Sequence, residues 1–146
     1  MNELEAMYND LIMEHSMNSY NKKKLDHADY CELGHNPSCG DEIQLELNVK
    51  DGIIEDMAFT GHGCAISQAS TSIMIDTLKG KSIEEARDII KTFIGMIKSE
   101  IKDEAELEKL EDAIAFQNVS HMPARVKCAL LAWHTLQDMI KEQENE

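Results

Sequence analysis

A β-hairpin pattern in the middle of the chain limits the possible folds more than any other feature of the sequence. Apolar residues occupy every second position of residues 43–49, and a second alternating run follows over residues 53–59. Asp51-Gly52, which separates the two runs, is a dipeptide typical of a two-residue hairpin turn. Alternation with a period of two predicts strands with one buried face. The chain is therefore expected to contain an antiparallel pair of strands.

Helices are predicted on both sides of this hairpin. Before it, residues 3–17 carry an apolar stripe at helical spacing, made of Leu4, Met7, Tyr8, Leu11 and Ile12. After it, Gly61 and Gly63 end the second strand, and a run of small residues leads into a helix that stops near Gly80. This arrangement predicts a strand-to-helix corner at Cys64.

Two further helices follow in the second half of the chain. Ser82 and Glu85 form a capping-box pattern and open a helix that continues towards Glu100. Pro123 fits the first turn of a last amphipathic helix that runs through Ile140.

Two segments have no clear apolar period. Residues 18–41 are expected to form a loop, with a short strand around residues 28–33. Residues 98–112 are rich in acids and predict a solvated helix or helical loop, anchored by Leu107 and Leu110. Together the patterns predict an α+β fold, with a small antiparallel sheet of about three strands packed against several helices. Residues 1–146 have the size of a single domain.

The charge of the chain limits its partners. Asp and Glu number 28 and Lys and Arg number 14, which gives a formal net charge of -14. Such a field repels nucleic acid and anionic lipid, but it speeds the encounter with a basic protein surface or a cation. No apolar run approaches the roughly 18 to 20 residues that span a bilayer. The acidic N-terminal residues do not resemble a signal peptide, so we expect a soluble, cytoplasmic protein.

The four cysteines are Cys31, Cys39, Cys64 and Cys128. An intracellular chain that is long enough to bury its own core does not need disulfides for stability. The cysteines therefore favour metal or sulfur chemistry, with two disulfides as the alternative.

Three of these cysteines and one carboxylate are each expected at the edge of a predicted element. Cys39 and Asp41 precede the first strand of the hairpin, Cys64 follows the second, and Cys128 lies near the start of the last helix. Three sulfurs and one oxygen would suit tetrahedral zinc. The alternative is that the cysteines are small buried hydrophobes and that Asp41 is only a turn residue.

Three motifs carry a resemblance to a known family. They are NPSCGD at residues 36–41, GHGCAISQASTSIM at residues 61–74 and RVKCALLAW at residues 125–133. In this order they resemble the SufU branch of the IscU-like iron-sulfur cluster assembly family, whose relatives include the N-terminal domain of NifU. Lys127 stands where the IscU branch has a histidine, and the long interval before Cys128 resembles the insertion typical of SufU.

The resemblance implies a function and a set of site residues. Zinc would be held by Cys39, Asp41, Cys64 and Cys128, and Cys39 would accept sulfur as a persulfide. The donor would be a PLP-dependent cysteine desulfurase of the SufS type, and the sulfur would pass to downstream cluster assembly proteins. From its position alone, Arg125 is a candidate for stabilising thiolate or persulfide charge.

Two other functions remain open from the sequence. The same residues would suit a scaffold without enzymatic activity, on which a [2Fe-2S] cluster is assembled, because thiolates bind zinc and iron alike. A zinc-stapled interaction module without sulfur chemistry is the third, although no C-x2-C pair is present. Cys31, His62 and His121 are assigned no role.

Overall fold

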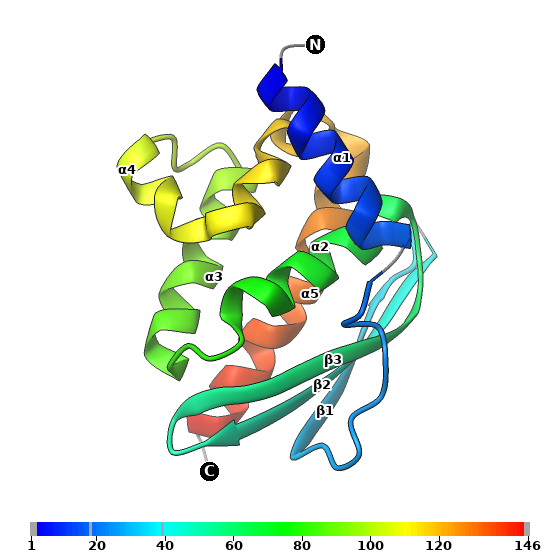
Figure 1. Cartoon of the computed structure of the whole chain (residues 1–146), viewed down its shortest axis with the longest axis vertical. Helices are drawn as coiled ribbons and strands as arrows, with labels where there is room; N and C mark the ends of the chain where they lie inside the picture. The colour runs from blue at the N-terminus through cyan, green and yellow to red at the C-terminus, as the bar shows by residue number, and fades with distance from the viewer. Residues whose placement is uncertain (1–2, 18, 39, 145–146) are drawn as a thin grey trace.

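The computed structural model describes residues 3–17, 19–38 and 40–144. Three antiparallel strands form one sheet in the order β1 (Tyr30–Asn36), β2 (Asp41–Lys50) and β3 (Ile53–His62). Helices α2 (Ala65–Leu78) and α5 (Pro123–Glu144) lie side by side across one face of the sheet (Figure 1). The predicted α+β fold is confirmed.

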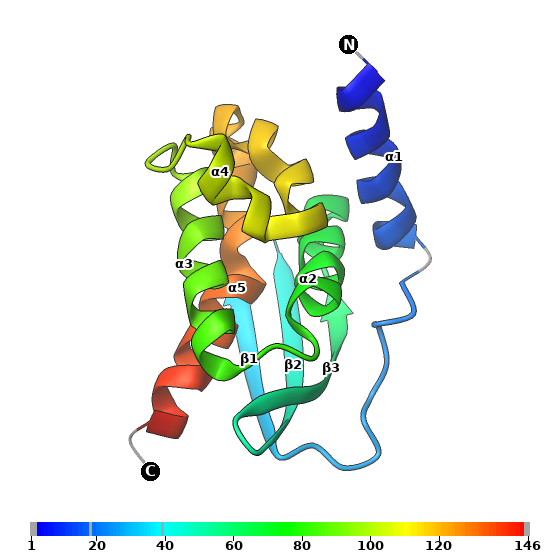
Figure 2. The same cartoon turned by 60° about the vertical axis from the view of Figure 1, so that its left-hand side comes forward.

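A second layer covers the two central helices. It consists of α3 (Ile83–Ile97), the short α4 (Glu104–Leu107) and the 3-10 segment η1 (Glu108–His121). Figure 2 shows this layer on one side of α2 and α5, and α1 (Glu3–Met17) on the other side of α2. One hydrophobic cluster joins the helices to the inner face of the sheet.

The hairpin forms as predicted, except that Ile54 is buried at the start of β3 and Ile53 is exposed. Ile43, Leu45 and Leu47 are fully buried on the face that the helices cover. Asp51 and Gly52 both have positive φ angles, 53° and 76°, which a tight turn between twisted strands requires.

The helix boundaries follow the predicted caps. The Ser82 side chain accepts a hydrogen bond from the Glu85 backbone N–H, which is the expected helix cap. The Ser82 hydroxyl also donates to the Glu85 carboxylate at 3.2 Å. Helix α5 begins at Pro123, as expected from its missing N–H. The structure differs in α1, where Met7 is 66% exposed, so the apolar stripe of this helix is narrower than its spacing predicts.

The acidic segment and the residues that follow it both contribute to the core. Leu107 and Leu110 are buried as expected, and η1 then continues beyond residue 112 to bury Phe116. The Phe116 ring packs edge-on against Phe93, with 6.1 Å between the ring centroids. The segment changes direction at Glu111, whose φ angle is 52°.

Strand β1 lies later in the chain than expected, at 30–36 instead of about 28–33. Gly34 is buried in it, and a Cβ atom there would overlap the Thr135 side chain of α5. Helix α5 can approach this closely because position 34 has no side chain, and the sheet is thereby extended to Asn36. None of the described helices is long and apolar enough to cross a membrane.

The close approach at Gly34 can be tested by overpacking it. Gly34→Ala should lower the free energy of unfolding by about 1–3 kcal/mol in urea titrations, because the added methyl group forces α5 away from β1. Combining it with Thr135→Ala should restore part of the loss, and Thr135→Ala alone is the control. Equal stability of Gly34→Ala and the wild type would contradict this packing.

Candidate metal centre

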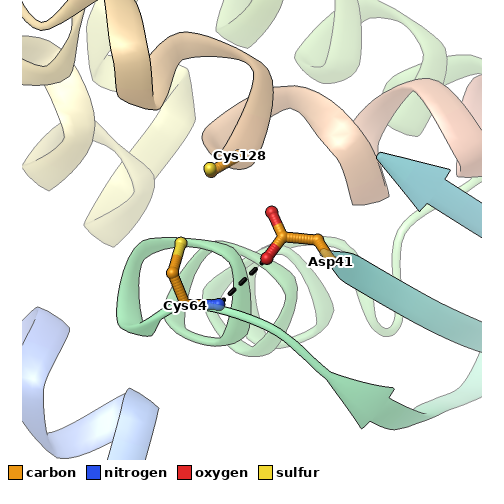
Figure 3. Close-up of side chains that lie close together, drawn as sticks. All are labelled: Asp41, Cys64 and Cys128. Carbon is orange, nitrogen blue, oxygen red and sulfur yellow. Dashed lines mark hydrogen bonds between the residues drawn. The ribbon is translucent and has the colours of Figure 1, made fainter. Parts of the chain in front are cut away.

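Three of the four predicted site residues lie together at one end of the sheet. Asp41 opens β2, Cys64 precedes α2, and Cys128 lies in the second turn of α5. Figure 3 shows the three side chains converging, and their ligand atoms lie within 4.8 Å of one another. The fourth predicted residue, Cys39, lies outside the described residues.

Cys64 is the N-cap of α2. Its Sγ accepts a hydrogen bond from the Ser67 backbone N–H at 3.4 Å, which satisfies one of the free donors at the helix start. The positive end of the helix dipole also favours negative charge on this sulfur. The strand-to-helix corner therefore holds the sulfur in a setting that suits a thiolate ligand.

Asp41 is fully buried, which is rare for a carboxylate. Its Oδ1 accepts a hydrogen bond from the Cys64 backbone N–H at 2.9 Å (Figure 3). Its Oδ2 has no hydrogen-bond partner among the described residues. A buried carboxylate oxygen without a partner is costly unless a cation binds it, so Asp41 fits a metal ligand.

Gly63 makes room for this carboxylate. A Cβ atom at position 63 would overlap Oδ1 of Asp41, so only glycine fits between the end of β3 and the start of α2. The sequence shows two glycines before Cys64, but it does not show that Gly63 lies against Asp41. Ser67, whose N–H binds Cys64, was likewise not among the predicted site residues.

Cys128 is buried, with 1% of its surface exposed. Two thiols and one carboxylate suit zinc and also iron, and tetrahedral coordination leaves room for a fourth ligand. The predicted fourth ligand, Cys39, lies two residues before Asp41 in the chain.

The other candidate residues are not part of the group that could hold a metal. Arg125 is exposed in the first turn of α5, and Lys127 is exposed beside Cys128. The His62 ring is exposed, 4.0 Å from the Glu42 carboxylate, and His121 is exposed. The exposed Cys31 lies on β1 and accepts a hydrogen bond from the Gln44 amide at 3.0 Å. Within the described chain, only Asp41, Cys64 and Cys128 form a group that could hold a metal.

Comparisons with known proteins identify the family of the chain. The model of the NifU-like N-terminal domain matches residues 7–145. The chain belongs to this family. Relatives in the family include the iron-sulfur cluster assembly scaffold protein IscU of Thermotoga maritima, 40% identical over 94% of this chain and 95% of that protein. The zinc-dependent sulfurtransferase SufU of Bacillus subtilis is 39% identical over 97% of this chain and 94% of its own length.

The fold of this chain also matches a solved structure of a related protein. The crystal structure of the SufU protein of Fervidobacterium islandicum AW-1 superimposes with a TM-score of 0.83 at 39% identity. The match covers 90% of this chain and 95% of that one. The expected resemblance to the IscU-like family is confirmed.

The capping role of Cys64 can be separated from metal binding in chelator-treated, reduced protein. Cys64→Ser should keep the stability of α2, because a serine hydroxyl caps a helix well. Cys64→Ala should lose about 1 kcal/mol of unfolding free energy, because the Ser67 N–H is left without an acceptor. Thermal and urea unfolding would measure both. Equal losses in the two variants would contradict the capping role.

Proposed function

We propose that the protein is a zinc-dependent acceptor and carrier of persulfide sulfur in iron-sulfur cluster assembly, with a cysteine desulfurase as the donor. Family membership supports a role in cluster assembly, because relatives named IscU and SufU cover nearly the whole chain. The observation that carries the proposal is the buried Asp41 carboxylate, which lies beside two thiols and has one oxygen without a partner among the described residues.

Zinc would be held by Cys39, Asp41, Cys64 and Cys128. When bound, zinc would keep its sulfur ligands deprotonated at neutral pH. Asp41, Cys64 and Cys128 are held by β2, the α2 cap and α5. The sequence around Cys39, with Pro37 and Gly40, predicts a loop. Cys39 is therefore the ligand best able to leave the site without unfolding an element.

The sulfur transfer is a thiolate exchange. The Cys39 thiolate would attack the terminal sulfur of the enzyme persulfide, the S–S bond of the donor would break, and the donor cysteine would leave as a thiolate. The new S–S bond leaves a persulfide on Cys39, with no external oxidant or reductant needed. A cation such as Arg125, three residues before Cys128, would stabilise the negative charge near the site.

A scaffold for a [2Fe-2S] cluster is the second candidate. Two thiols and a carboxylate also suit iron, and the relative from Thermotoga maritima is named a scaffold protein. Metal analysis and the visible spectrum of anaerobically purified protein separate the two functions. Stoichiometric zinc without colour supports the carrier, and a reddish-brown chromophore supports the scaffold.

The identity of the sulfur acceptor is the decisive test. With a SufS-type desulfurase and free cysteine, intact-protein and peptide mass spectrometry should find the added sulfur on Cys39. Cys39→Ser should abolish the stimulation of sulfide release. Cys31→Ser is the matched control, because Cys31 is an exposed thiol outside the cluster, and it should keep full stimulation. Sulfur on Cys128, with Cys39→Ser still active, would support the scaffold instead.

Loss of the carboxylate should weaken metal binding. Asp41→Ala and the isosteric Asp41→Asn should each lower zinc affinity by at least about 10-fold in chelator competition, because one anionic ligand is removed. Glu42→Gln, at the next position but outside the cluster, is the control and should bind zinc like the wild type. Unchanged affinity in Asp41→Asn would remove the carboxylate from the ligand set.

A further inference from the structure

Strand β1 is an edge strand that faces an open groove. In the described part of the chain it pairs only with β2. An edge strand presents N–H and C=O groups to which another extended chain can bind. Residues of β1 and α5 line a groove of about 630 Å³ that is open to solvent.

The groove is acidic. Glu32 of β1 lies in it with Asp138 and Glu142 of α5, and Lys141 is the lysine on its rim. Partial burial raises the pKa of the Glu32 carboxyl, and the neighbouring Glu142 and Asp138 raise it further. Both neighbours therefore repel a charged Glu32, and a cationic side chain from outside would relieve that repulsion.

The side chains of β1 alternate in a way that defines what could pair with it. Glu32 and Gly34 face α5, whereas Leu33 alternates with them, is 54% exposed and lines the open side of the groove. A strand added at this edge would place every second residue beside Glu32 and the α5 carboxylates. The residues between them would lie beside Leu33.

The groove leads towards the metal centre. A second hollow of about 240 Å³ shares His35, Leu131 and His134 with it. This hollow reaches Lys127, the residue before Cys128. A chain lying along β1 would therefore extend towards the cluster of Asp41, Cys64 and Cys128.

We propose that the β1 edge and α5 form a docking groove for an extended basic segment of a partner protein. The segment adds to the sheet as a fourth strand, with Lys or Arg at alternate positions and apolar residues between them. This surface is distinct from the proposed sulfur chemistry and does not depend on Cys39. Two other occupants fit the groove less well. A second copy of the chain would bring like charges together, and the groove carboxylates are not among the described groups close enough to share a metal ion.

A labelled peptide tests the groove. A fluorescein-labelled heptapeptide of alternating Lys and Val should bind the metal-loaded protein in fluorescence anisotropy. A peptide of the same composition with its lysines clustered should bind at least about 10-fold more weakly, since it cannot match the alternation of β1. The assay contains no desulfurase and no persulfide, which separates docking from sulfur transfer.

Two triple variants test the contribution of the carboxylates. Glu32→Gln/Asp138→Asn/Glu142→Gln should weaken peptide binding at least about 10-fold, because each cationic contact loses its partner. The control Glu104→Gln/Glu108→Gln/Asp112→Asn removes the same charge from the exposed acidic segment and should change binding little. The groove variant should fold, because the raised pKa of Glu32 means that its negative charge destabilises the native state at neutral pH.

Amide chemical shifts locate the peptide. In ¹⁵N-labelled protein, the largest peptide-induced changes should fall on β1 and the facing residues of α5. Equal weakening of peptide binding in the two triple variants would show that binding depends on net charge alone. Chemical-shift changes away from β1 would show that the peptide binds elsewhere. A concentration-dependent dimer that the groove variant abolishes would assign the edge to a second copy. Each of these results would overturn the proposal.

Discussion

The burial of the Asp41 carboxylate is the constraint on which the site depends. Its Oδ1 accepts a hydrogen bond from the Cys64 N–H, and its Oδ2 has no partner in the part of the chain that the structure describes. This bond joins the first residue of β2 to the cap of α2, so the sheet and the central helix meet at a charged group. The fold therefore buries a carboxylate, and this burial becomes favourable when a cation binds the carboxylate.

Much of the fold was predictable because local chemistry and tertiary packing agree. The alternation around Asp51-Gly52, the Ser82 cap and Pro123 each specify a structure within a few residues. The extent of β1 was not predictable, because it depends on Gly34 meeting a helix about 100 residues later in the chain. The path of η1 was not predictable for a different reason, since its positive φ at Glu111 breaks the helical period that sequence patterns use.

The site was predictable in outline but not in its details. Cysteines at the edges of elements, with the family resemblance, identified Asp41, Cys64 and Cys128. The role of Gly63 depends on a contact across the sheet edge, and that of Ser67 depends on a backbone N–H. Backbone donors and missing side chains leave little trace in composition or spacing, so these contributions become visible only in three dimensions.

The surroundings of Trp133 have a practical consequence. This single tryptophan is fully buried in α5 and stacks on Phe93, with 3.9 Å between the ring centroids. Its indole N–H donates to Ser70, whose hydroxyl donates in turn to the Ala129 carbonyl, directly after Cys128. Since no other indole contributes, the tryptophan fluorescence of the chain reports on a single location at the α2–α5 contact. The emission therefore provides a label-free optical signal for separation of the two helices that carry the cysteines.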